Sequence, residues 1–172
     1  MKKIPKPTGA DFRDPRVPAI DVERFVDAQH DDFARALGEI EAGRKQSHWM
    51  WYVFPQVTGL GASGMSIHYA IGIVAEAGAF LAHPVLGPRY RQMVNAVWHQ
   101  VVEGGTTIHN LFGSPDDAKL VSSLTLFAGA ARRLDAAEPD LRTFITQVDE
   151  VLEAASTQGL ARCTTTEIFI EE

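Results

Sequence analysis

Apolar side chains recur at steps of three and four residues along most of this chain, which is the spacing of an amphipathic α-helix. Phe33, Leu37 and Ile40 show this pattern clearly in the first such stretch. The pattern predicts helices over residues 21–42, 49–54, 71–81, 84–103, 115–134, 139–152 and 164–169, and a short turn over 107–112. A break near Gln29–His30, with Asp31 or Asp32 starting a second helix, is the alternative for the first stretch. No stretch alternates apolar and polar residues as a half-buried strand does. We therefore expect an all-α fold, a compact single-domain bundle of six or seven helices without a significant sheet.

Residues that favour helix ends support several of these boundaries. Gly43 and the pair Gly104–Gly105 each follow a helical stretch, where glycine commonly ends a helix. The strongest start signal is Ser114–Asp117, because serine caps helices, proline suits their first turn, and two acids complement the helix dipole. We expect Ser114 at the N-cap and Pro115 as the first helical residue.

The chain has 172 residues, which suits one domain with its own core, and two domains would be cramped. Its first 20 residues hold four prolines and few apolar side chains. We expect residues 1–20 to form a Pro-rich N-terminal arm, flexible or laid over the surface. Residues 21–172 are then expected to form a single helical domain.

The formal net charge of −6 argues against general nucleic-acid binding, because phosphate backbones select a surplus of lysine and arginine. A local basic patch around Arg44 and Lys45 is still compatible with this charge. No run approaches the ~18 apolar residues of a membrane span, and no apolar block follows the N-terminal lysines as in a signal peptide. The single cysteine, Cys163, forms no internal disulfide. We expect a cytoplasmic protein without membrane contact, and the sequence indicates neither a cofactor nor an oligomeric state.

The segment Ser47–Gln56 (SHWMWYVFPQ) is apolar on every face of a helix. Such a segment is buried all round or surrounds something. It predicts either a central core helix or a stacking wall for a planar ligand such as a nucleobase. The two interpretations are compatible, and the polar residues His48 and Gln56 at its ends favour a site.

A glycine-rich loop, Gly59–Ser66 (GLGASGMS), follows this segment. Its glycines would let backbone N–H groups converge on an anion, and Ser63 and Ser66 would add hydroxyls. The loop matches neither a Walker loop nor a Rossmann fingerprint. A flexible connection between helices is the alternative interpretation.

Histidines and hydroxyl residues provide further candidates. His48, His68 and His83 would act as acid or base if they converged, whereas each alone is more often structural or exposed. No histidine or cysteine spacing is typical of a zinc site, so no metal site is expected. Lys119 lies one turn into the helix that Asp116 and Asp117 begin, and three hydroxyl residues follow it (Ser122, Ser123 and Thr125).

These candidates combine into one hypothesis, that the chain is a cytoplasmic enzyme or binding protein for a small molecule. The more specific version of this hypothesis is that the small molecule is nucleotide-derived. The expected catalytic residues are His48 as acid or base, Asp117, and Lys119 as an anion contact. The expected ligand-binding residues are Trp49, Gln56, Gly61, Ser63, Tyr69 and Ser123. The first alternative is a non-enzymatic interaction module that uses the aromatic segment as its anchor. The second is that the polar residues only connect the helices.

Several motifs between residues 20 and 130 are, in combination, typical of one family. They are Arg24–Phe25 with Ala28–Gln29, Gly43–Tyr52, Phe54–Gln56, Gly59–Gly61 with Ser63, Tyr69–Ile71, His83–Pro84 with Leu86–Gly87, Phe112–Asp117, and Lys119–Leu120 with Ser122–Ser123 and Thr125–Phe127. On these motifs the chain resembles an uncharacterised bacterial family of unknown function, sometimes labelled calpastatin-like. The resemblance implies a compact all-helical fold and supplies no catalytic residue. Family members carry an Asp-containing turn near the C-terminus, where this chain reads GLARCTT at 159–165.

Overall fold

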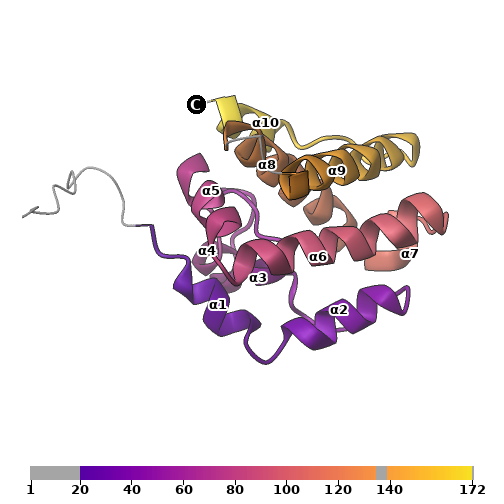
Figure 1. Ribbon diagram of the computed structural model, residues 1–172, viewed down its shortest axis with the longest axis horizontal. Coiled ribbons are helices and arrows are strands. Elements are labelled where there is room, and N and C mark those ends of the chain that lie inside the picture. Colours follow the sequence, from indigo (N-terminus) through magenta and orange to yellow (C-terminus); the bar gives the residue numbers. More distant parts are fainter. Residues whose placement is uncertain (1–19, 135–138, 172) are drawn as a thin grey trace, which may run out of the picture.

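The computed structural model describes residues 20–134 and 139–171 and is helical throughout (Figure 1). The expected N-terminal arm therefore lies outside the described residues, apart from Ile20. Over the described ranges there are ten α-helices and one π-helix, and no strand. The feature most similar to a strand pairing is an isolated β-bridge between Val57 and Ile71. The elements are α1 (Glu23–Gln29), α2 (Phe33–Glu41), α3 (Met50–Val53), α4 (Gly64–His68), α5 (Val74–Ala82), α6 (Leu86–Trp98), η1 (His99–Glu103), α7 (Ile108–Phe112), α8 (Asp116–Arg133), α9 (Pro139–Thr157) and α10 (Thr164–Glu171).

The all-α fold is confirmed, but the expected count of six or seven helices is wrong. The stretch 21–42 divides into α1 and α2, and the short helices α4 and α7 occur where a loop and a turn were expected. Local capping explains both short helices, because Ser63 accepts a hydrogen bond from the Ser66 N–H and Thr107 accepts one from the Asn110 N–H. A helix of one turn carries too few residues to show a period in the sequence.

The start of α8 also differs from the expectation. The helix begins at Asp116, one residue later than predicted, with Pro115 rather than Ser114 at the N-cap and no side-chain cap. Asp116 and Asp117 do occupy the first turn, where carboxylates complement the positive end of the helix dipole.

The helices pack around α6 and α8. Helix α6 crosses the molecule with α1 and α2 on one side and the group α8, α9 and α10 on the other (Figure 1). Tyr90 of α6 lies at the centre, with ring centroids 4.3–5.9 Å from those of Phe54, Phe80, Phe127 and Phe144. Such buried aromatic pairs add roughly 0.5–1.5 kcal/mol each beyond their area. None of the helices in the described ranges is long and apolar enough to cross a membrane.

The three hydroxyl residues of α8 lie inside this core. The Ser123 hydroxyl pairs with Tyr90 Oη at 3.0 Å, Ser122 pairs with Thr166 of α10 at 2.8 Å, and Thr125 donates to the Val121 carbonyl. Buried polar groups are costly unless they are hydrogen-bonded, and all three are. Burial raises the pKa of Tyr90 even though the Ser123 hydrogen bond acts in the opposite direction. Ser123 therefore joins α8 to α6 and Ser122 joins α8 to α10, whereas Thr125 bonds within α8.

Candidate functional site

The carboxylate of Glu39, near the end of α2, holds the segment that leads into the aromatic helix α3. It accepts hydrogen bonds from the Gln46 N–H at 2.8 Å, the Ser47 N–H at 2.9 Å and the indole Nε1 of Trp49 at 2.8 Å, and also one from the Ser47 hydroxyl. Burial by itself raises the pKa of Glu39, but these four hydrogen bonds outweigh it and lower the pKa to about 2. Residues 44–49 are therefore fixed in place and are not a free loop.

Lys45 joins this segment to α7 and α8. Its N–H donates to the Leu111 carbonyl at 2.7 Å, and its Nζ lies 2.7 Å from Asp116 Oδ2 and 2.6 Å from the Ser47 carbonyl. The side chain is only 7% exposed, and its Nζ also lies 5.0 Å from the centroid of the Trp49 ring. Such a buried cation is stable only when its charge and its donors are satisfied.

Asp116 is shared by two lysines. Its second oxygen, Oδ1, accepts a hydrogen bond from Lys119 Nζ at 2.8 Å. Burial acts to raise the pKa of Asp116, but the hydrogen bonds from Lys119 and Lys45 outweigh it, so that the pKa lies below its ordinary value. Lys119 Nζ also lies 5.5 Å from the centroid of the Trp51 ring. Both lysines are thus already engaged with protein groups.

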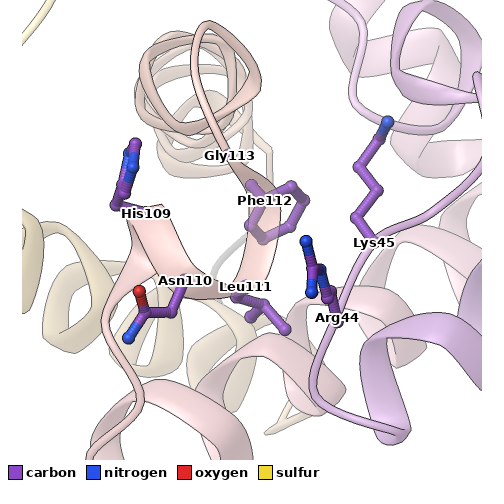
Figure 2. Close-up of a pocket in the computed structure, with 7 residues that line it drawn as sticks. All are labelled: Arg44, Lys45, His109, Asn110, Leu111, Phe112 and Gly113. Atoms are coloured by element: carbon purple, nitrogen blue, oxygen red, sulfur yellow. The ribbon is translucent and has the colours of Figure 1, made fainter.

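A cavity of about 440 Å³ opens between this segment and α7. Figure 2 shows Arg44 and Lys45 on one side of it and the α7 residues on the other. The lining residues are Arg44, Lys45, His109, Asn110, Leu111, Phe112 and Gly113. The volume lies within the roughly 300–1,000 Å³ of small-molecule sites, which combine apolar walls with a few polar groups.

Arg44 is the one cation of this lining whose charge is not neutralised. Within the ranges that the structure describes, no residue forms a hydrogen bond or an ion pair with its guanidinium, whereas the adjacent Lys45 is bound to Asp116. In Figure 2 the Arg44 side chain lies beside Phe112 and Leu111, and the Lys45 side chain extends away from it. The planar guanidinium offers several N–H donors that match carboxylate and phosphate oxygens.

His109 brings an oriented imidazole to the same cavity. Its Nδ1 lies 2.9 Å from Asp117 Oδ2, and the other oxygen of Asp117 accepts the Ala118 N–H at 2.7 Å. The side chain of Asp117 is 8% exposed and that of His109 is 67% exposed. A buried carboxylate accordingly fixes the ring of a histidine whose other nitrogen reaches solvent.

Four of the nine residues predicted for the site lie in the segment 44–49 or at the start of α8, which together form the corner of the molecule beside the cavity. Asp117 contacts His109, Lys119 contacts Asp116, and Trp49 lies beneath Lys45. His48 is an exposed residue of the fixed segment 44–49. Trp49 is fully buried and bonded through Nε1, so the aromatic segment contributes core to this corner and no free stacking face.

The other five predicted residues lie elsewhere and do not line this cavity: Gln56, Gly61, Ser63, Tyr69 and Ser123. The Gln56 carbonyl accepts the Ile71 N–H, and Ser63 caps α4. On either side of Tyr69, the carbonyls of His68 and Ala70 accept hydrogen bonds from Arg24 of α1. The glycine loop and the α7 cavity are therefore separate features.

Sequence reasoning overlooked the residues that shape the cavity, which are Glu39, Arg44 and His109. The sequence indicates Arg44 and Lys45 only as a local basic patch, and nothing in the pattern around His109 distinguishes it from a surface histidine. The one signal available was the spacing of His109 and Asp117 across the glycine-containing turn FGSPDD, which folds the chain back on itself. Across the described residues, no group of three or more histidine, cysteine or acidic side chains is arranged to hold a metal ion.

Comparisons with known proteins agree with the fold and assign no chemistry. A family model described as "Protein of unknown function (DUF1810)" matches residues 19–156. Among solved structures, the chain is similar to the conserved hypothetical protein Rv1873 from Mycobacterium tuberculosis, with 36% sequence identity and a TM-score of 0.74. The similarity covers 89% of this chain and 98% of that one. A search of the curated proteins found no match.

Proposed function

Since this chain belongs to the DUF1810 family of proteins of unknown function, as its motifs predicted, we propose a function from the geometry of the α7 cavity. The protein binds a small anionic molecule there, one that carries a phosphate or carboxylate group. Arg44 is the anion contact, and His109 and Asn110 supply the neighbouring polar groups. We also propose that the ligand is nucleotide-derived and that the protein is cytoplasmic. A free thiol such as that of Cys163 is compatible with the reducing environment of the cytosol.

The unneutralised charge of Arg44 carries the proposal. Three cations gather at this corner, but Asp116 binds both Lys45 and Lys119. Glu39 and Asp117 are the other carboxylates nearby, and they are hydrogen-bonded to the segment 46–49 and to His109, whereas Arg44 has no carboxylate partner in the described ranges. An anion that enters the cavity therefore meets a guanidinium whose donors are not taken by any carboxylate of the described residues.

The interaction-module alternative receives less support. It requires an aromatic side chain of the segment Ser47–Gln56 at the surface as an anchor, because binding hot spots are exposed in the free protein. Trp49 is fully buried, and Trp51 is half-buried with Lys119 over its ring. The buried Trp49 of this segment instead packs under Lys45, which lines the cavity.

Replacing Arg44 with alanine is expected to weaken anion binding by about tenfold or more, because a charge-assisted hydrogen bond contributes roughly 1.5–3 kcal/mol. The measurement is a thermal-shift screen of inorganic phosphate, small carboxylates and nucleotides, followed by calorimetric titration of the strongest binder. A ligand at 100 times its dissociation constant adds about 2.7 kcal/mol of stability.

Arg91→Ala is the matched control. Arg91 is a half-buried arginine of α6 that lines a different hollow, and the substitution removes the same charge from the chain. We expect this variant to bind as the wild type does. Equal weakening in both variants, or no stabilisation of the wild type by any anion, contradicts the proposal.

A further inference from the structure

The pair His109–Asp117 gives the same cavity the parts of an acid–base site. We infer that the protein hydrolyses phosphate esters there, with His109 as the catalytic base and Asp117 as its positioning residue. The inference rests on the proposed function, because Arg44 must first hold the phosphate group.

The hydrogen bonds of Asp117 determine which nitrogen of His109 carries the proton. Both of its oxygens already accept hydrogen bonds, one from the Ala118 N–H and one from His109 Nδ1. A carboxylate has no hydrogen to donate, so Nδ1 carries the proton. The lone pair of the neutral ring is then on Nε2, which has no protein partner in the described part of the chain. An oriented imidazole with one free nitrogen is the usual form of a general base.

No other histidine in the described ranges combines these features. The Nδ1 of His83 accepts from two backbone N–H groups and its Nε2 faces Glu23, so both of its nitrogens are occupied. His99 pairs with Glu103, but that carboxylate is 55% exposed and His99 lines no part of the α7 cavity. Of the histidines in the described ranges, His109 alone pairs with a buried carboxylate and lines the α7 cavity.

The lining of the cavity indicates direct attack by water. Among the described residues that form it, none is a serine, threonine or cysteine that would act as a nucleophile. In the proposed step His109 Nε2 takes one proton from a water molecule while the water oxygen bonds to phosphorus. The P–O bond to the leaving group breaks on the side of phosphorus opposite to the water, so the leaving oxygen takes its proton from solvent and Nε2 returns its proton to solvent. Arg44 stabilises the charge that builds on the phosphoryl oxygens, as arginine does in phosphoryl transfer.

The test uses bis(p-nitrophenyl) phosphate and p-nitrophenyl phosphate, with p-nitrophenyl acetate as an ester that has no anionic group for Arg44. Wild-type protein should release p-nitrophenol from at least one phosphate ester, and His109→Ala should lower kcat about 10²–10⁴-fold. Added imidazole should restore part of the rate in His109→Ala. Asp117→Asn should lower kcat with little change in KM, because the substrate does not contact Asp117.

His99→Ala is the control, since it removes an exposed, carboxylate-paired histidine outside the cavity, and its rate should match the wild type. Melting temperatures of all variants show whether each is folded. If phosphate binds in an Arg44-dependent manner but no ester is hydrolysed, or if the rate does not depend on His109, the inference is overturned while the proposed binding function stands. If phosphate does not bind at all, both are overturned.

Discussion

Replacing Glu39 with alanine is expected to lower the free energy of unfolding by about 3 kcal/mol, the largest loss that we expect from removing a single surface-accessible carboxylate. The substitution leaves the indole N–H of Trp49 buried without an acceptor and releases the backbone N–H groups of Gln46 and Ser47. An orphaned buried donor costs about 1–3 kcal/mol, and water can replace only the outer contacts. For a domain of this size the melting temperature should fall by roughly 6–12 °C.

Chemical denaturation of Glu39→Ala and Glu41→Ala provides the comparison. Glu41 is an exposed acid on the same helix, and its side chain makes no hydrogen bond or ion pair in the described ranges. We expect Glu41→Ala to change stability by less than about 0.5 kcal/mol. Equal stability of the two variants would mean that the Glu39 contacts do not hold the segment. Because residues 44–49 carry Arg44, Glu39→Ala should also weaken anion binding.

The same carboxylate sets a range of pH in which stability changes. The pKa of Glu39 is about 2 in the folded protein and 4.5 at its ordinary value, so folding favours the charged form. Its contribution is therefore fully present above pH 4.5 and is lost as the pH falls from 4.5 toward about 2. The stability difference between wild type and Glu39→Gln should shrink across this range. A stability difference between the two proteins that stays constant down to pH 2 would contradict the low pKa of Glu39.

Replacing Gly87 with alanine is expected to lower the free energy of unfolding by about 3 kcal/mol. Gly87 is buried in the first turn of α6, where the helix passes close to the end of α5. A Cβ atom there would lie 2.0 Å from the Leu81 carbonyl oxygen and 3.0 Å from its carbon. Backbone cannot rotate away as a side chain can, so the two helices must separate. Urea denaturation measures the loss.

Gly38→Ala is the matched control for this prediction. Gly38 lies within α2, and a Cβ atom at this position would meet no other atom within 4 Å. Alanine is a better helix former than glycine by roughly 0.5–1 kcal/mol, so this variant should become more stable. If Gly87→Ala is as stable as the wild type, the close approach of α5 and α6 is not as described.

The long helices follow from the sequence because their period is repeated over several turns. Leu120, Leu124 and Phe127 of α8 recur at steps of three and four residues and are fully buried. The short helices could not be predicted in this way, since α4 and α7 depend on single capping contacts by Ser63 and Thr107. Helix boundaries set by one residue leave little periodic signal.

The candidate site was predictable only in part, for a physical reason. Asp117 and Lys119 drew attention because polar residues stood at the start of an otherwise apolar helix. The pairing of Asp117 with His109 runs across a turn in the chain, and Lys45 reaches Asp116 from a distant part of the sequence. Neither His109 nor Lys45 interrupts an apolar pattern, so neither pairing could be inferred. Which carboxylate meets which cation depends on how α2, α7 and α8 pack, and that is a property of the tertiary structure.

The most direct test of the anion site is a titration of ¹⁵N-labelled protein with inorganic phosphate, followed by amide chemical shifts. We expect the largest changes at Arg44 and Lys45 and along His109–Gly113, and we expect these changes to disappear in Arg44→Ala. Changes that gather instead in the glycine loop Gly59–Ser66, or that persist unchanged in Arg44→Ala, would contradict the assignment of the α7 cavity as the ligand site.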